Sequence, residues 1–360
     1  MKIEEVARLR LRNQRLAGRP FTTPEEVVRW FGAMQAQEFP VAKWSIARRL
    51  RGATNVALDR ALAAGTILRT HTLRPTWHFV LPEDLGWISE LTAPRVRAFM
   101  RSYDRKLELD DAVYRRSHAL LRKALGRGEH LTRSELAAAL QKGGIVAATQ
   151  RLGHLMLRAE LDLVVCSGAM KGKQQSYALV EERAPRARRL SREEALAELA
   201  SRYFASHGPA TLRDFMWWSS LTSADAQRAI AANGKRLASD LVDGRRFWFT
   251  LPLPRPRAAA PVVHLLQGYD EYVVAYTESK RALNVAGLSS SAPRGAVSFL
   301  HAVVVDGQFV GHWRRALGDA TSIEVRLLRP LGAAEKRALL GEVERYGRFI
   351  EAEPTLRGHS

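Results

Sequence analysis

The 360-residue sequence predicts an α+β fold with four domains. A group of short helical patterns followed by a β-hairpin pattern occurs three times in the first 251 residues. Three prolines then fall within the five residues from Pro252 to Pro256, which precludes regular structure there. Beyond this break most apolar segments have the length of strands. These observations predict three helix-and-hairpin domains followed by a mostly β domain.

The first predicted domain covers residues 1–105. Thr23 is a favourable N-cap residue, Pro24 suits the first helical position, and two glutamates follow in the first turn, so a helix is expected to begin here. The run from Thr66 to Leu81 is rich in β-branched and aromatic residues and is interrupted by Pro75, which is typical of a β-hairpin. The predicted helices of this domain cover residues 3–17, 24–32, 44–50 and 56–64.

The same order recurs in residues 106–190 and 191–251. Asp243-Gly244 lies between two apolar runs of the third domain and is a strong signal for a hairpin turn. Helices followed by a hairpin are the order of a winged helix-turn-helix, so the sequence predicts three such units in tandem. The predicted elements are helices at 112–126, 131–141, 149–160, 191–206, 211–219 and from 222, with strands at 163–167, 175–180, 237–242 and 247–251.

Residues 252–360 form the fourth predicted domain. Asp306-Gly307 predicts another hairpin turn. Strands are expected at 262–266, 298–305, 309–313 and 322–328, and one helix at 333–350. This mostly β pattern predicts a barrel-like or sandwich domain that carries a terminal helix.

The net charge of the chain limits the classes of partner that it is expected to bind. Lysine and arginine total 56 against 37 aspartate and glutamate, a formal net charge of +19. Such an excess attracts polyanions, either nucleic acid or an anionic membrane surface. The single cysteine, Cys166, permits no internal disulfide, no apolar run reaches 18 residues, and the start of the sequence lacks a signal-peptide pattern. We therefore expect a cytoplasmic protein.

Most familiar enzyme signatures are missing, which argues against nucleotide-binding, zinc-protease and serine-hydrolase sites. His71 and His78 lie seven residues apart in an extended run, so they should point to opposite faces and share no metal ion. Asp270 and Glu271, read as strand residues, should also face opposite ways, and a buried acid paired with an arginine is the expected role. We predict neither a metal nor a cofactor.

Four segments, taken in order, make the chain recognisable. They are Gln35-Ala36-Gln37 at an expected helix end, Thr70 to Phe79 (THTLRPTWHF), Gly208 to Ser219 (GPATLRDFMWWS) and Tyr269-Asp270-Glu271-Tyr272. The spacing of the two glutamines alone is typical of a solvated turn. Together the segments resemble the bacterial winged-helix DNA glycosylases of the AlkZ type, over nearly the whole chain.

The resemblance implies three tandem winged helices and a β-barrel that form a C-shaped monomer with a basic channel for duplex DNA. It also implies excision of alkylated purines, including nitrogen-mustard or azinomycin-type adducts and interstrand crosslinks. The family's catalytic motif is glutamine, an aliphatic residue, then glutamine or aspartate, which carries over to Gln35 and Gln37. The preferred lesion stays open, as does the choice between general repair and self-protection of a toxin producer.

The chemistry of a cationic N7-alkylated purine suits such a site. Its glycosidic bond is already weakened, so the base leaves without a general acid, and the enzyme has to place water behind C1′ and stabilise an oxocarbenium-like sugar. A glutamine carbonyl can accept a hydrogen bond from that water. We predict water placement by Gln37 with support from Gln35. Because the motif holds no lysine, we expect a monofunctional glycosylase.

The predicted hairpins carry the candidates for contact with DNA. Burial in the core is an equally expected alternative for the first hairpin. Trp44, Trp77, Trp217 and Trp218 are expected in the core. The candidates are Arg69, His71, Arg74 and His78 on the first hairpin, Lys171, Lys173, Gln174 and Gln175 on the second, and the pairs Arg48-Arg49 and Arg314-Arg315.

The competing hypothesis is a winged-helix regulator that binds DNA without catalysis, for which the charge would be equally suitable. The Gln35-Ala36-Gln37 motif in its family context favours the enzyme, and no dimerisation helix or effector domain is recognisable. A membrane-surface role is less favoured, because no helix combines a broad apolar face with a basic one. The expected partner is double-stranded DNA with alkylated purines, at the nucleoid and away from membranes.

Overall fold

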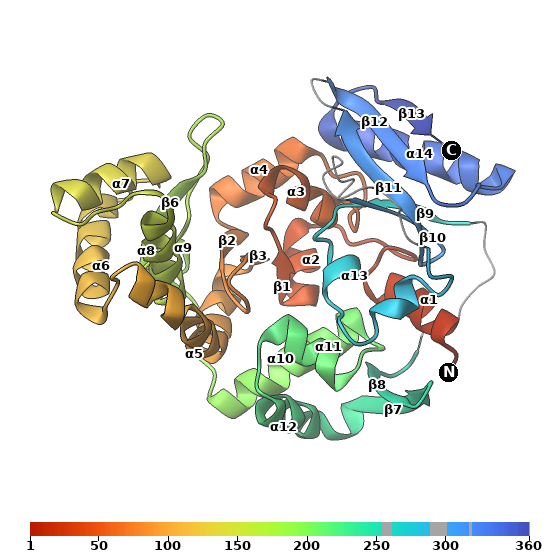
Figure 1. Ribbon diagram of the computed structural model, residues 1–360, viewed down its shortest axis with the longest axis horizontal. Helices are drawn as coiled ribbons and strands as arrows, with labels where there is room; N and C mark the ends of the chain where they lie inside the picture. The colour runs from red at the N-terminus through yellow and green to blue at the C-terminus, as the bar shows by residue number, and fades with distance from the viewer. Residues whose placement is uncertain (254–260, 289–300, 317–318, 360) are drawn as a thin grey trace.

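The structure, a computed structural model, describes residues 1–253, 261–288, 301–316 and 319–359. The fold is mixed α+β. Figure 1 shows residues 107–190 (yellow to green) at one end of the molecule and the C-terminal sheet and helix (blue) toward the other, with the N-terminal segment between them. Both chain ends lie on the same side of that view. Part of the proline-rich break, residues 254–260, lies outside the described residues.

The N-terminal segment confirms the predicted helix start and hairpin. The Thr23 side chain accepts a hydrogen bond from the Glu26 N–H (3.2 Å), and Glu26 accepts one from the Thr23 N–H (3.1 Å), which closes a capping box. The hairpin carries a third strand, and a long helix that the sequence analysis did not predict follows it. The elements are α1 (Ile3–Asn13), α2 (Pro24–Phe31), β1 (Ala33–Gln35), α3 (Phe39–Ala47), α4 (Asn55–Ala64), β2 (Leu68–His71), β3 (Trp77–Val80) and α5 (Pro82–Lys106).

The segment that follows packs around a core of its own. Leu121, Leu136 and Leu155, from three helices, are fully buried in one cluster. Thr132 caps its helix through another capping box, where the sequence predicted a start. The elements are α6 (Asp111–Leu125), β4 (Leu131–Thr132), α7 (Arg133–Lys142), α8 (Thr149–Leu161), β5 (Val165–Ser167), β6 (Ser176–Leu179) and α9 (Val180–Arg183).

The third segment confirms the predicted hairpin turn. Asp243 and Gly244 have φ angles of 48° and 74°, as a type I′ turn requires at both central positions. The elements are α10 (Arg192–His207), α11 (Leu212–Ser219), α12 (Ser223–Asn233), the 3₁₀ turn η1 (Gly234–Arg236), β7 (Leu237–Val242) and β8 (Arg245–Thr250).

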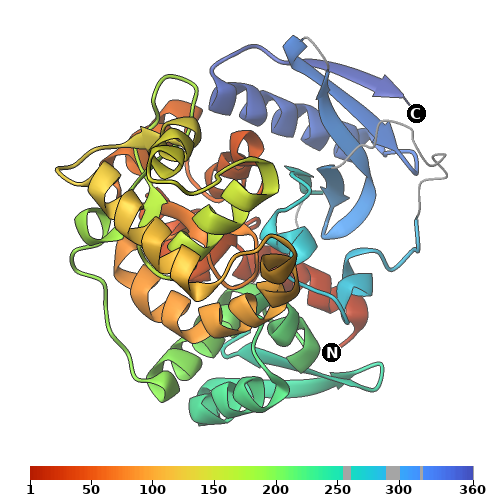
Figure 2. The same ribbon diagram turned by 60° about the vertical axis from the view of Figure 1, so that its left-hand side comes forward.

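The prediction of a barrel or sandwich at the C-terminus is wrong. The described strands form one open sheet in the order β13-β12-β11-β10-β9. Helix α14 lies along this sheet (Figures 1 and 2), and Leu339, Val343 and Tyr346 bury one of its faces, so the sheet need not close on itself. The elements are β9 (Val263–Leu266), α13 (Glu271–Val274), the 3₁₀ turn η2 (Lys280–Leu283), β10 (His301–Val305), β11 (Gln308–Ala316), β12 (Asp319–Leu327), α14 (Ala333–Ile350) and β13 (Thr355–His359).

Packing joins segments that the sequence analysis separated. Ala33, Leu68 and Val80 from the first sheet share a cluster with buried residues of α10 to α12. Trp44 of α3 packs with the C-terminal sheet and α14. The predicted domain boundaries at residues 105, 190 and 251 therefore stay predictions, since the cores of the first, third and fourth segments run into one another.

Candidate active site

Gln35 ends the short strand β1 and lies against the central strand of its sheet. The strand order is β1-β3-β2, and Gln35 is paired with His78 of β3. Neighbouring residues of β1 alternate between two cores, because Ala33 joins the cluster with α10 to α12 and Met34 joins the cluster inside the N-terminal segment. The sequence analysis placed Gln35 at a helix end. It is instead a strand residue, and its side chain is 6% exposed.

Arg74 holds the side chain of Gln35. It lies in the connection between β2 and β3, directly after Leu73, whose φ of 58° turns the chain sharply. Its guanidinium Nη2 donates to Gln35 Oε1 at 2.8 Å. Burial lowers the pKa of Arg74, while the charge of Glu271 acts in the opposite direction. The arginine is therefore a buried, orienting group for Gln35.

Glu271 supports the main chain of Gln35 from a position 236 residues away. Its Oε1 accepts the Gln35 N–H at 2.6 Å, and its Oε2 accepts from His207 Nε2 (3.0 Å) and Trp218 Nε1 (2.9 Å). Glu271 is 1% exposed, yet the hydrogen bonds from His207 and from the Gln35 N–H and the charge of Arg74 outweigh burial and lower its pKa to about 2. An ionised carboxylate thus lies directly behind Gln35.

The expected strand placement of Asp270 and Glu271 is wrong, because both residues begin the short helix α13. Asp270 pairs with Arg49 through two contacts of 2.8 Å in the fully buried core, which confirms the expected acid–arginine pair. Arg48 is also buried, against Glu342 and His264. The prediction that Arg48 and Arg49 line a cationic channel is therefore wrong.

A cavity of about 710 Å³ opens beside Gln35 and Arg74. Its rim carries three aromatic side chains that are unusually exposed: Phe99 (63%), Trp217 (51%) and Tyr269 (36%). Trp217 was expected in the core and is not there, whereas Trp44 and Trp218 are. Neither a carboxylate nor a lysine lines the cavity within the described residues. The lining residues are Gln35, Arg74, Pro75, Thr76, Arg95, Val96, Phe99, Arg213, Met216, Trp217, Ser220, Leu221, Tyr269, Val274 and Thr277.

Gln37 lies just beyond the end of β1 and does not line this cavity. It is half-buried, and its Oε1 accepts a hydrogen bond from the Trp77 N–H at 3.3 Å. Arg69 is buried behind it, donates to the Ala36 carbonyl (3.0 Å), and lies over the Trp77 ring. Burial lowers the pKa of Arg69 to about 10.

The two hairpin histidines are also buried. The register pairs His71 with Trp77 and Thr70 with His78, which confirms that His71 and His78 face opposite sides of the sheet. His71 contacts Glu160, and His78 is completely inaccessible. Their proposed contact with DNA stays a prediction, and their burial argues against it.

The second hairpin behaves differently. Lys171, Lys173, Gln174 and Gln175 are exposed at the connection between β5 and β6. Lys171 pairs with Glu135 at 2.8 Å. Arg314, in the C-terminal sheet, pairs with Glu324 at 2.7 Å. Of the candidates for DNA contact, those on the second hairpin are thus the best exposed.

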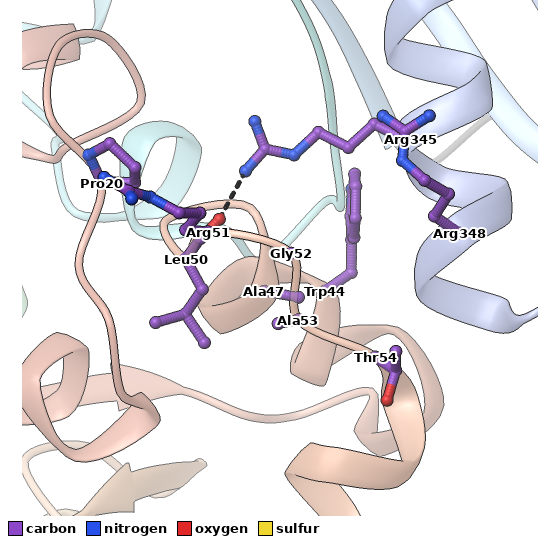
Figure 3. A pocket seen from close by; sticks show the side chains of 10 residues that line it. All are labelled: Pro20, Trp44, Ala47, Leu50, Arg51, Gly52, Ala53, Thr54, Arg345 and Arg348. Carbon is purple, nitrogen blue, oxygen red and sulfur yellow. Dashed lines mark hydrogen bonds between the residues drawn. The ribbon is translucent and has the colours of Figure 1, made fainter.

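A second cavity, of about 480 Å³, lies between α14 and the connection from α3 to α4 (Figure 3). Arg345 donates from Nη2 to the carbonyls of Leu50 (2.8 Å) and Arg48 (3.0 Å). The side chains of Arg51 and Arg348 also line it, and neither has a hydrogen-bond or ion-pair partner within the described part of the chain. The cavity therefore presents uncompensated positive charge.

The described residues contain no group of three histidine, cysteine, aspartate or glutamate side chains arranged to hold a metal ion. Cys166 is buried, which raises the pKa of its thiol to about 12. Among the helices of the described residues, none is both long and apolar enough to cross a membrane.

Comparison with known proteins shows that this chain is a DNA glycosylase and therefore an enzyme. Residues 28–349 match the model of the family described as "DNA glycosylase AlkZ-like", and the chain belongs to this family. It is 26% identical over 319 residues to a Streptomyces sahachiroi protein named "Interstrand DNA cross-link repair glycosylase", covering 84% of this chain and 85% of that protein. The solved structure of Streptomyces sahachiroi DNA glycosylase AlkZ shares its fold, with a TM-score of 0.82 over the full length of both chains at 22% identity.

The sequence analysis missed Glu271 and Arg74 as partners of Gln35. Nothing in the local pattern links residues 35, 74 and 271. The available signal was that the three residues fall in three of the four segments that carry the family resemblance.

Proposed function

We propose that this enzyme hydrolyses the N-glycosidic bond of cationic N7-alkylated purines in double-stranded DNA. The observation that carries the proposal is Gln35, held by Arg74 in the wall of an open cavity that no described carboxylate lines. A cationic base needs no protonation to leave, so a neutral amide that positions water is sufficient equipment. Among the described residues, the same wall offers no carboxylic acid to protonate a neutral base. Undamaged purines are therefore poor substrates.

Gln35 and Gln37 are the proposed catalytic residues. Gln35 lines the cavity and Gln37 does not, so the geometry favours Gln35 for direct contact with water or sugar, with Gln37 in support. A lyase step needs an amine nucleophile, and no described lysine lines the cavity, which supports a monofunctional enzyme.

Bulky adducts and interstrand crosslinks are proposed substrates as well. The wide opening and exposed aromatic rim of the Gln35 cavity support this, because a crosslinked base cannot be fully extruded into a closed pocket. The related Streptomyces sahachiroi protein is named for crosslink repair. The family membership disfavours the non-catalytic regulator.

We further propose that the protein binds DNA as a C-shaped monomer at the nucleoid, with three winged-helix units around a basic channel. Each of the first three segments contains helices and a small antiparallel sheet, which supports this arrangement. Exposed cations would carry the contacts with phosphates: Arg95 and Arg213 at the rim of the Gln35 cavity, Lys171 and Lys173 on the second hairpin, and Arg51 and Arg348 at the second cavity.

The decisive experiment measures release of 7-methylguanine from methylated duplex DNA. Wild type, Gln35→Ala and Gln37→Ala are compared at one salt concentration, with DNA affinity measured in parallel. Release by wild type alone, with binding retained in the variants, supports the proposal. Binding without release from methylated or crosslinked DNA by wild type would rule it out.

A further inference from the structure

A row of polar side chains crosses the first sheet on the face that carries Gln35. Gln35 is paired with His78, and His78 with Thr70, so the three side chains are cross-strand neighbours. Thr70 and His78 are fully buried. Within the described residues, Thr70 Oγ1 and His78 Nε2 have no hydrogen-bond partner. Buried polar atoms are rarely left in this state in native proteins, so a small polar molecule is the expected partner.

The hydrogen bond of the other ring nitrogen fixes the form of His78. Nδ1 lies 2.9 Å from the Thr76 carbonyl oxygen, and a carbonyl only accepts, so Nδ1 carries the hydrogen. Burial lowers the pKa of His78 to about 3, the charges of Arg74 and His71 act in the same direction, and Glu271 acts against them. The imidazole is neutral at physiological pH. Nε2 is therefore a hydrogen-bond acceptor.

Arg74 supplies the complementary donor. Its Nη2 is bonded to Gln35, but its Nε–H is buried and has no partner in the described part of the chain. Arg74 is 9% exposed, and its charge adds to the effect of burial in lowering the pKa of His78. One acceptor, one donor and one hydroxyl without partners thus belong to side chains that are neighbours or hydrogen-bond partners of Gln35 or His78. A water molecule, which donates two hydrogen bonds and accepts two, satisfies this set.

We propose that His78, Thr70 and Arg74 bind a water molecule beside Gln35, and that His78 Nε2 accepts a proton from this water during base excision. The inference rests on the proposed function. As the bond between C1′ and the purine nitrogen breaks, its electron pair neutralises the cationic purine. The water oxygen bonds to C1′, and the proton it loses passes to His78 Nε2. The next water molecule to enter the same position takes the proton from His78 and returns the imidazole to its neutral form. Gln35 orients the water, and His78 takes its proton.

Two substitutions at position 78 separate this role from a structural one. In His78→Gln the carboxamide reaches about as far as Nε2 and can present an acceptor there, whereas the carboxamide of His78→Asn ends near Nδ1. The single-turnover rate of 7-methylguanine release is expected to fall about 100-fold or more in His78→Asn and to stay within about tenfold of wild type in His78→Gln, since proton acceptance contributes on this scale. DNA affinity should be unchanged in both. The wild-type rate, measured as a function of pH, should not change near pH 6.5, where an ordinary histidine titrates.

His118→Asn is the matched control. His118 Nε2 is another buried nitrogen for which the described part of the chain offers no hydrogen-bond partner, but it lies on α6. Its rate should equal that of wild type. Two outcomes would overturn the inference: equal losses of rate in both His78 variants that follow their melting temperatures, or no loss of rate in His78→Asn. In either case, activity of the wild-type enzyme would leave the proposed function intact. If wild type releases no base, both fail. A crystal structure adds an independent check, because it must contain an ordered water within hydrogen-bond distance of His78 Nε2.

Discussion

Replacing Glu271 by glutamine tests the buried carboxylate that supports Gln35. Glu271 accepts three hydrogen bonds, and a glutamine at this position keeps one acceptor oxygen. If that oxygen serves His207 and Trp218, the amide nitrogen faces the Gln35 N–H, and two donors oppose each other at a buried position. Leaving one buried donor unpaired costs about 1–3 kcal/mol.

The lowered pKa of Glu271 gives a second measure of the folding free energy that Glu271→Gln removes. A pKa of about 2 in the folded protein, against 4.5 for an ordinary glutamate, corresponds to about 3 kcal/mol in favour of the ionised form. Divided by the unfolding entropy expected for 360 residues, a loss of about 3 kcal/mol lowers the melting temperature by about 4 °C. Because the folded pKa lies below the unfolded one, the stabilisation is present above about pH 4.5 and is lost as the pH falls toward 2.

Melting temperatures of wild type and Glu271→Gln at pH 7, 5 and 3 test this pH-dependent stabilisation. The Glu271→Gln variant should melt below wild type at pH 7, and the difference should shrink at pH 3. The single-turnover rate should fall as well, since the Gln35 main chain loses its anchor. Glu278→Gln, a partly exposed carboxylate in the same segment, is the control and should change stability by less than about 1 kcal/mol. A Glu271→Gln variant that melts like wild type at pH 7, or whose deficit is the same at pH 3, would refute the reasoning.

Three further outcomes are expected. Asp214→Asn should lower the free energy of unfolding by about 3 kcal/mol in denaturant titrations, because one carboxylate oxygen accepts three successive backbone N–H groups of residues 277–279 at 2.9–3.1 Å; an unchanged midpoint would contradict this. The double variant Arg51→Gln, Arg348→Gln should reduce the slope of log affinity for duplex DNA against log salt by about 2, while an identical slope would remove these residues from the DNA contact. Cys166 should resist a thiol reagent at pH 8 in the folded protein and react fully after denaturation, since burial raises its pKa to about 12; rapid reaction of the folded chain would show that the segment opens.

Local rules predicted the elements whose signals lie within a few residues. The capping residues Thr23 and Thr132 and the two Asp-Gly turns act within one helical turn or one hairpin, so their structural roles could be inferred without knowledge of the rest of the chain. Strand β1 could not be predicted in this way. It is three residues long and exists because β3 offers it a pairing edge.

Of the residues that line the Gln35 cavity, the sequence singled out Gln35, through the family resemblance, and Arg74, as a candidate for contact with DNA. Alternation along a strand would give Arg69 and His71 an exposed face, but both faces of this sheet are covered, one by the N-terminal helices and the other by α10 to α12. Side chains expected at a DNA surface are therefore buried. Glu271 reaches Gln35 only because α13 packs against β1, a contact between segments 236 residues apart.

The buried charges around Gln35 also meet a requirement of the proposed chemistry. A cationic purine and an oxocarbenium-like sugar would be disfavoured by Arg74 alone. The ionised Glu271 offsets that charge, while burial keeps His78 neutral and lowers the pKa of His207. In the proposed DNA complex, the charge that attracts DNA is instead held by exposed side chains such as Arg95, outside the Gln35 row. Screening by salt acts on exposed charges and much less on buried ones. Under the proposed function, DNA binding and bond cleavage are therefore governed by separate sets of charges, and a strongly basic protein can still stabilise positive charge on its substrate.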